Sequence, residues 1–306
     1  MGPRDGGRFD EERARGVLGS AGFAARDAEL LALGENAVFG VGPHGPRGSH
    51  GPHGPRGPVV RIGRSPELLD RMRREVRVAE WLADQGVPAV RPAEPEARLV
   101  AGHPVSVWQR LPEPERQAKT ADLAALLRLV HRLPAPPFPL PRRDLLGGVE
   151  RWLRLAGSAI DPADAAYLRE RRDHYAAAAD HLTPHLSPGP IHGDALPRNV
   201  HIGPDGPVLL DLETFSDDLR EHDLVVMALA LDRYGLDPAA YDAFAGAYGW
   251  DVREWEECAV LRGARETASC AWVAQHAPAN PAALAEFRRR VASLREGDPT
   301  VRWHAF

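Results

Sequence analysis

The sequence is poor in lysine, in cysteine and in long apolar segments. Lys119 is the only lysine among the 306 residues, so arginine carries nearly all of the positive charge. With a formal net charge of -5, the chain lacks the basic surplus of a protein that binds nucleic acid through its phosphates. Nowhere do 18 apolar residues follow one another, and the first residues have no apolar core. We therefore expect neither a membrane span nor export by a signal peptide.

Cysteine usage and composition limit the kind of protein further. The two cysteines, Cys258 and Cys270, are too few for a secreted chain that depends on disulfides, so we expect a cytoplasmic protein. The content of 43% hydrophobic and 26% charged residues is that of an ordinary globular protein with one large domain or two lobes. The net charge is -8 from residue 192 onward and +3 before it. This division would suit a protein that binds an anion in the first part and a cation in the second. Chance variation in the charge of solvent-exposed faces explains it equally well.

Residues 1–111 have the pattern of a small α+β lobe. Ser65 followed by Pro66, with apolar residues at three- and four-residue steps, predicts one long amphipathic helix that ends at Gly86. Short apolar segments bounded by turn-forming residues predict strands. We expect strands at 28–34, 37–41, 59–62, 98–100 and 104–110, and a short helix at 10–19.

A glycine- and proline-rich segment, residues 42–58, separates the second and third of these strands. Glycine recurs there at every third position, as in collagen. The repeat is too short for a triple helix, which also needs three chains. We therefore expect a disordered insertion within one strand connection.

From residue 112 onward the pattern is mainly helical, and we place the boundary between lobes 1–111 and 112–306. One predicted pair of strands, 191–202 and 208–211, interrupts the helices. The expected helices are 121–132, 148–156, 162–182, 221–234, 238–248, 252–275 and 281–295.

The predicted strand pair concentrates polar residues that suit phosphoryl transfer. Asp194 and Asn199 lie five residues apart on one loop, and Asp211 ends the returning strand, so the hairpin brings it back beside that loop. Carboxylate and amide oxygens are hard ligands that suit Mg²⁺, and one carboxylate would remain to accept a hydroxyl proton. The chain has only three asparagines, which disfavours the alternative that this segment is merely a solvated turn.

Three motifs resemble those of the aminoglycoside phosphotransferase and choline kinase superfamily, which contains small-molecule kinases. They are His192-Gly-Asp194-Ala-Leu-Pro-Arg-Asn199, Leu210-Asp211-Leu-Glu213 and Arg220-Glu-His-Asp-Leu224. The resemblance implies a two-lobed protein-kinase-like fold of the α+β class. Its N-lobe would be a small antiparallel sheet with one long helix, and its C-lobe would be mainly helical. The resemblance also implies ATP and Mg²⁺, with Asp194 as the catalytic residue, Asn199 and Asp211 as metal ligands, and His192 and Asp223 as structural support.

The same resemblance assigns the nucleotide half of the site to the first lobe. Gly34-Glu-Asn36 falls where the family has its phosphate-covering loop, and Arg61 matches the basic residue of the third strand. Glu75 matches the ion-pair partner of that residue, with Arg64 and Glu80 as the alternatives if the register differs. Lys119 lies beyond the lobe boundary, so an arginine has to hold the phosphates, which a guanidinium can do two oxygens at a time. The other interpretation is that Arg61 is a solvated strand residue.

Adenine would lie against the connection between the lobes. Gln109 and Leu111 are the residues expected to contact it, and Trp108 either lines the site or packs in the core. The acceptor would be a small molecule with a hydroxyl group. A cationic acceptor, such as an aminoglycoside or an amino alcohol, would suit the carboxylates of the second lobe. The candidates for contact with it are Glu213, Asp217, Asp218, Glu221 and Glu266.

Two other functions remain open at this point. A metal-dependent phosphoesterase could use His192, Asp194, Asn199, His201 and Asp211, but the upstream Asp-x-His pair of such enzymes is missing. A non-catalytic nucleotide-binding pseudokinase would need the loss of a metal or base residue, and none is missing. The acceptor, the choice between ATP and GTP, and the oligomeric state are left open.

Overall fold

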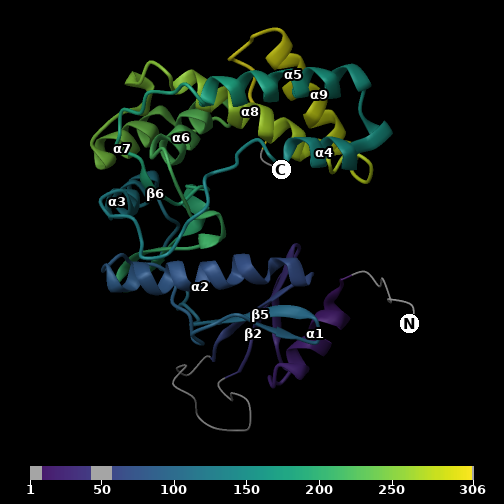
Figure 1. Ribbon diagram of the computed structural model, residues 1–306, viewed down its shortest axis with the longest axis vertical. Coiled ribbons are helices and arrows are strands. Elements are labelled where there is room, and N and C mark those ends of the chain that lie inside the picture. Colours follow the sequence, from purple (N-terminus) through teal and green to yellow (C-terminus); the bar gives the residue numbers. More distant parts are fainter. Residues whose placement is uncertain (1–8, 43–56, 305–306) are drawn as a thin grey trace. The chain divides into compact units, whose positions relative to one another are not determined.

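The computed structural model describes residues 9–42 and 57–304 (Figure 1). The chain divides into two compact units. The N-terminal unit contains residues 1–117 and 201–213, and the C-terminal unit contains residues 118–200 and 214–306. Residues 201–213 thus join the first unit, although they follow the boundary at residue 112 expected from the sequence.

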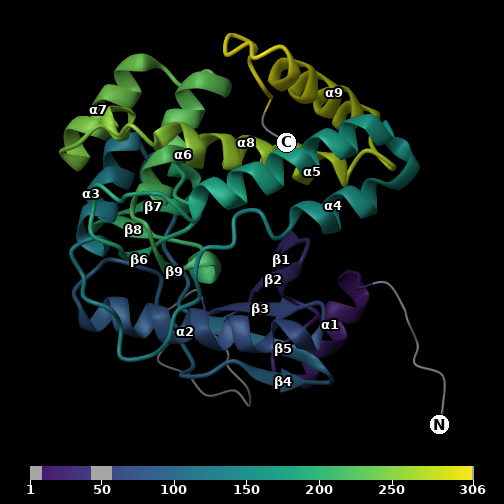
Figure 2. The same ribbon diagram turned by 45° about the horizontal axis from the view of Figure 1, so that its top comes forward.

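The N-terminal unit is built on a five-stranded antiparallel sheet with the order β1-β2-β3-β5-β4 (Figure 2). Alternate residues of a strand point to opposite faces. Val60 and Ile62 of β3 therefore pack with α1 on one face, while Arg61 points to the other face, where α2 contributes Glu75. The elements are α1 (Glu11–Ser20), β1 (Glu29–Leu33), β2 (Asn36–Gly40), β3 (Val59–Gly63), α2 (Leu69–Asp84), β4 (Arg98–Val100) and β5 (His103–Trp108).

The long helix α2 forms as its apolar spacing predicts. It follows a 3₁₀ turn, Pro66–Leu68, and the apolar residues on its inner face, Met72, Val76 and Leu82, are buried. The helix ends just before Gly86, whose φ of +73° is a left-handed conformation that favours glycine.

A two-stranded sheet, β7 (Val200–Gly203) and β8 (Gly206–Leu209), joins residues 201–213 to the N-terminal unit. The Leu209 N–H donates to the Pro88 carbonyl, and the Leu209 carbonyl accepts from the Val90 N–H, both at 2.9 Å. These bonds fix the end of β8, after which Asp211 and Glu213 follow.

The strand segment expected over 191–202 consists of two short strands, separated by the loop that the sequence analysis expects to carry Asp194 and Asn199. The chain leaves the short strand β6 (Gly189–Ile191) at Gly193, which has a φ of +83°. A Cβ atom there would lie 2.4 Å from the Thr214 carbonyl oxygen, so only glycine fits. A 3₁₀ turn, Pro197–Asn199, then precedes β7. The polar residues of this segment consequently lie on a loop.

The C-terminal unit is mainly helical, with α8 packed against α4, α5, α6 and α9 (Figure 1). Gly263 of α8 lets α5 approach closely, because a Cβ atom there would lie 2.1 Å from the Tyr175 ring. The elements are α3 (Thr120–Val130), α4 (Val149–Ala156), α5 (Pro162–Ala179), β9 (Ser216–Asp218), which pairs with β6, α6 (Glu221–Arg233), α7 (Pro238–Tyr248), α8 (Cys258–Ala274) and α9 (Pro281–Arg295).

The α+β class, with an antiparallel sheet and one long helix followed by a mainly helical part, is confirmed. Cys258 and Cys270 are both buried and free of disulfides. Most of the insertion expected at 42–58 lies outside the described residues. Within the described ranges, no helix combines the length and the apolar character needed to cross a bilayer.

Candidate functional site

A cavity of about 620 Å³ lies within the N-terminal unit. Its lining comes from the β1–β2 turn, from β3 and α2, from the end of β5 and from the segment after β8. All six residues predicted to bind the nucleotide line it, together with Asp211 and Glu213. These six are Gly34, Asn36, Arg61, Glu75, Gln109 and Leu111.

The polar wall of this cavity is centred on Arg61. Its Nη1 atom lies 2.8 Å from both carboxylate oxygens of Glu75, and its Nη2 atom lies 2.5 Å from Glu213 Oε2. The Asn36 amide oxygen, in the orientation that hydrogen bonding requires, lies 2.7 Å from Nη2. Arg61 is therefore held in place by partners from β2, α2 and the segment after β8.

Burial and charge act in opposite directions on this pair. Burial alone would lower the pKa of Arg61, but the charges of Glu75, Glu213 and Asp211 outweigh it and raise the pKa. Burial raises the pKa of Glu75 to about 7, although Arg61 opposes this, and Glu213 and Asp211 add to the rise. Three carboxylates thus surround one central guanidinium, a surplus of negative charge that favours a cation in the cavity.

The β1–β2 turn is tied to α2 by an ion pair that the sequence analysis did not anticipate. Arg71 Nη2 lies 2.9 Å from Glu35 and 3.9 Å from Glu213. Its position one helical turn before Glu75 was a usable signal, because residues four apart share a helix face. Of the two alternatives for the central pair, Arg64 instead lies 3.8 Å from Glu35, and Glu80 is exposed.

Asp211 has a strained backbone. Its φ of +53° is left-handed, which costs a non-glycine residue about 1–2 kcal/mol. Backbone strain of this kind gathers at functional sites. Here it turns the chain directly after β8, so that Asp211 and Glu213 both line the cavity.

Most of the remaining lining of the cavity is apolar. Trp108 is 7% exposed and donates from Nε1 to the Ser106 hydroxyl at 2.9 Å. Trp108 therefore both packs in the interior and lines the cavity. The Gln109 backbone N–H donates to the Arg91 carbonyl, and its side-chain amide donates to the Pro92 carbonyl.

In the C-terminal unit, the loop after β6 is closed by Asn199. Its side-chain Nδ2 donates to the Asp194 backbone oxygen at 2.8 Å and to Asp194 Oδ2 at 3.2 Å. Because the amide nitrogen faces Asp194, the amide oxygen is the atom of Asn199 that remains suited to a metal ion. Asp194 itself is 30% exposed and also accepts from Arg198 at 3.1 Å.

Asp223 holds this loop through hydrogen bonds to its backbone. It is fully buried, and its two oxygens accept from the backbone N–H groups of His192 at 2.7 Å and Gly193 at 2.8 Å. His131, a residue that the sequence analysis missed, bonds the same carboxylate through Nε2 at 3.1 Å. Burial alone would raise the pKa of Asp223, but these partners lower it to about 2. His192 thus meets Asp223 through its backbone, while its ring Nδ1 accepts from the Asp194 N–H.

Two arginines that sequence reasoning also missed converge on the Gly193 carbonyl. Arg143 Nε donates to it at 3.0 Å and Arg265 Nη2 at 3.4 Å. Burial and the nearby charge of Arg143 lower the pKa of Arg265 to about 10. Both arginines are more than 40 residues from Gly193 in the sequence, so no local pattern points to them.

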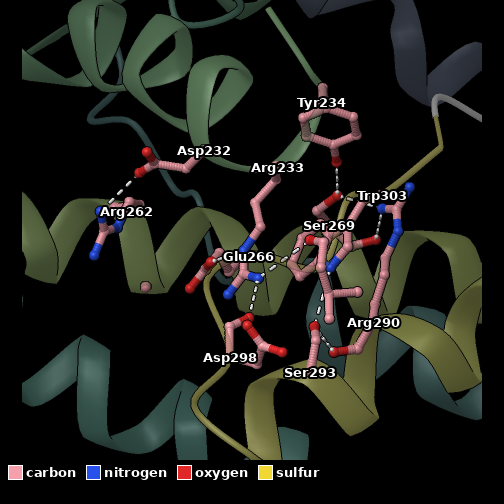
Figure 3. Close-up of polar contacts among 12 residues, drawn as sticks. Asp232, Arg233, Tyr234, Arg262, Glu266, Ser269, Arg290, Ser293, Asp298 and Trp303 are labelled. Carbon is pink, nitrogen blue, oxygen red and sulfur yellow. Dashed lines mark hydrogen bonds and ion pairs between the residues drawn. The ribbon is translucent and has the colours of Figure 1, made fainter.

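Three of the carboxylates expected to contact a cationic acceptor are occupied inside the protein. Glu266 pairs with Arg233 at 2.7 Å (Figure 3), and Glu221 accepts from the His185 and Leu186 N–H groups. Asp218 is buried and accepts from the backbone N–H groups of Arg143 and Leu219. Glu213 pairs with Arg61 in the cavity, and Asp217 lies half-buried in β9.

Oxygen donors that suit Mg²⁺ are present in both units. Asp211 and Glu213 line the cavity of the N-terminal unit, and Asn199 and Asp194 lie on the loop of the C-terminal unit. Hard oxygen ligands of this kind fit the preference of that ion. Over residues 9–42 and 57–304, no group of three or more His, Cys, Asp or Glu side chains is arranged as a ready-made metal centre.

Comparison with protein-family profiles gives a match. The profile of the phosphotransferase enzyme family (APH) matches residues 53–261. A search of curated protein sequences gives no match.

Several solved structures share the fold at low sequence identity. An amicoumacin kinase in complex with AMP-PNP and Ca²⁺ is 14% identical, with a TM-score of 0.68 over 96% of this chain and 95% of that chain. A choline/ethanolamine kinase family protein from Mesorhizobium loti is 16% identical, with a TM-score of 0.62 over 94% and 96%. The aminoglycoside phosphotransferase APH(4)-Ia is 12% identical, with a TM-score of 0.62 over 89% and 95%.

Proposed function

The chain belongs to the phosphotransferase enzyme family, and on this premise we propose that it transfers the γ-phosphoryl group of ATP to a hydroxyl group of a small molecule. The observation that carries the proposal is the cavity of the N-terminal unit. It combines a fixed Arg61–Glu75 pair, the strained Asp211 and an apolar wall in one space of about 620 Å³. That volume lies within the range of small-molecule sites.

We assign the two ends of this cavity to the two ends of the nucleotide. The apolar wall, which includes Val38, Val59 and Trp108, suits the adenine ring. The Gly34–Asn36 turn and Arg61 suit the phosphates. In a chain whose only lysine lies outside this unit, Arg61 takes the role of the phosphate-binding cation and supplies a fixed positive charge beside the phosphates.

Asn199 and Asp211 are the residues that would hold Mg²⁺. When bound, this ion neutralises charge on the β- and γ-phosphate oxygens. Glu213 already pairs with Arg61, so we assign it to orienting that arginine. The surplus of carboxylates around Arg61 supports a cation here.

Asp194 is the proposed catalytic base. It accepts the hydroxyl proton of the acceptor while the acceptor oxygen bonds to the γ-phosphorus and the bond from that phosphorus to the β–γ bridging oxygen breaks, which releases ADP. Asn199 and Asp223 hold the loop that presents this carboxylate.

For the acceptor we propose a small hydroxyl compound of the kind named for the structural neighbours, such as an aminoglycoside or choline. Asp217 is the remaining weak candidate for contact with a cationic group. Asp218, Glu221 and Glu266 are left out of the proposal, because their carboxylates are buried against protein partners.

The test is ADP release with aminoglycosides, choline-like alcohols and sugars as acceptors. Replacing Asp194 by Asn should lower turnover with the active acceptor by about 10²- to 10⁴-fold and leave ATP affinity unchanged. Asp205→Asn, in an exposed turn, is the matched control and should keep full turnover. Unchanged turnover in Asp194→Asn would show that another group takes the proton.

A further inference from the structure

A second cavity, of about 330 Å³, lies wholly within the C-terminal unit and has no part in the proposed reaction. It is formed mainly by α3 and α7, which pack side by side (Figures 1 and 2), and by the segments around Leu186 and Arg220. Three of its eight lining residues are arginine, and none is acidic. The lining consists of Arg128, His131, Arg132, Leu186, Arg220, Tyr248, Gly249 and Trp250.

None of the three guanidinium groups forms an ion pair with an acidic side chain of the described residues. Arg128 donates to the Ala247 carbonyl at 3.0 Å, and Arg220 donates to the Leu133 carbonyl at 3.4 Å, but a carbonyl carries no net charge. The Arg220 Nε atom is buried and has no hydrogen-bond partner within the described part of the chain. Leaving such a buried donor without a partner is unfavourable, and a ligand that accepts from it removes this penalty. Arg132 is exposed at the rim.

Two acidic groups lie nearby, but neither belongs to the lining. Glu221, next to Arg220 in the chain, uses Oε1 to accept from the N–H groups of His185 and Leu186, and its buried Oε2 has no hydrogen-bond partner within the described part of the chain. Asp223 accepts from two further backbone N–H groups and from His131. The lining itself therefore carries a net positive charge.

An aromatic wall completes the cavity. The Trp250 ring stacks on the His185 ring, with centroids 4.2 Å apart and an interplanar angle of 11°. Tyr248 is held by a hydrogen bond of 2.8 Å between its hydroxyl and His131 Nδ1. A flat ring face next to guanidinium groups suits a ligand that has an anionic end and a planar or apolar body.

We propose that this cavity binds a phosphate monoester. Guanidinium groups match the oxygens of a phosphate dianion, and the unpartnered Arg220 Nε supplies a donor that the protein itself does not use. The volume admits a small ligand. The proposal does not depend on the kinase reaction, because none of the lining residues takes part in it.

The test is calorimetric titration of the whole chain with two probes, inorganic phosphate and phenyl phosphate. We expect phenyl phosphate to bind more tightly, because its ring can lie against Trp250. Arg132→Gln and Arg220→Gln should each weaken phenyl phosphate binding by about tenfold or more. Trp250→Leu should remove the advantage of phenyl phosphate over inorganic phosphate.

Two further variants locate the binding. Arg154→Gln, an exposed arginine on α4, should bind phenyl phosphate like the unmodified chain, and Arg61→Gln, in the other cavity, should keep the binding event that Arg132→Gln weakens. Absence of binding at millimolar phenyl phosphate overturns the proposal, and so does equal affinity in Arg132→Gln and Arg154→Gln. Loss of binding in Arg61→Gln alone overturns it too, because it places the anion in the N-terminal unit. If Arg220→Gln fails to fold, Arg132→Gln decides, since that side chain is exposed.

Discussion

Each unit contains a network of arginine and carboxylate side chains. The two networks are built from the same groups but differ in their surroundings. In the N-terminal unit Arg61 lies 2.8 Å from Glu75. In the C-terminal unit Arg233 lies 2.7 Å from Glu266 (Figure 3), and Arg290 lies 2.7 Å from Glu286. Contact distance alone does not separate the two networks.

The C-terminal network is closed on itself. The guanidinium carbons of Arg233 and Arg290 lie 4.9 and 5.0 Å from the centroid of the Trp303 ring. Trp303 donates to the Ser293 hydroxyl, and Arg290 donates to the His304 carbonyl. The network therefore fastens the segment after α9 onto α6, α8 and α9, and its charges are matched by protein partners.

The N-terminal network is open. Arg61 borders a cavity, three carboxylates surround it, and Asp211 is held in a strained conformation. The difference teaches that a functional ion pair is recognised by what surrounds it. Surplus charge, empty volume and strain together point to a ligand, whereas a filled and balanced network points to stability.

The largest expected effect comes from breaking the closed network. Arg290→Met removes a 2%-exposed guanidinium and leaves Glu286 buried with fewer partners. We expect a loss of about 3–5 kcal/mol in the free energy of unfolding, measured by urea titration. Arg154→Met, at an exposed position, is the control and should change it by less than about 0.5 kcal/mol. A loss in Arg290→Met no larger than in the control would show that the network is not structural.

A smaller effect concerns the open network and pH. The pKa of Glu75 is about 7 in the folded protein and 4.5 in the reference state. The folded state thus binds its proton more tightly, so the contribution of Glu75 to stability is greatest below pH 4.5 and falls as the pH rises to 7. Between pH 5 and pH 8 the unmodified chain should lose about 2 kcal/mol more in unfolding free energy than Glu75→Gln. Parallel pH profiles of the two proteins would contradict the raised pKa.

The smallest expected change in stability is at Asp211. Glycine adopts its φ of +53° without strain, so Asp211→Gly should keep or raise the unfolding free energy by up to about 1 kcal/mol. The same change should abolish phosphoryl transfer, because the proposed metal ligand is lost. Asp205→Gly, in an exposed turn, is the matched control and should retain activity. Retained transfer in Asp211→Gly would remove Asp211 from the site.

Local sequence patterns predicted a large part of the fold and part of the candidate site. The helix spacing predicted α2, and the resemblance to the kinase superfamily paired Arg61 of β3 with Glu75 of that helix, two side chains that the structure brings into contact. The polar loop was also evident from the spacing of Asp194 and Asn199. These features depend on neighbours within a few residues or on a single strand–helix connection.

What sequence reasoning missed is decided by tertiary contacts. His131 and Arg265 reach the loop from distant helices, and no periodicity reports such partners. The burial of Glu266 against Arg233 could not be read from the sequence for the same reason, since it depends on how α6 and α8 pack. The predicted strand over 191–202 is broken at Gly193, because the left-handed backbone there brings the Thr214 carbonyl close.

The central claim is that the open network holds the phosphates of ATP. Calorimetric titration of ATP with Mg²⁺ into the unmodified chain, Arg61→Gln and Arg98→Gln tests it directly, because Arg98 is an exposed arginine of the same unit. We predict that Arg61→Gln binds ATP about tenfold or more weakly and that Arg98→Gln binds it as the unmodified chain does. Equal affinity for ATP in all three proteins would contradict the account.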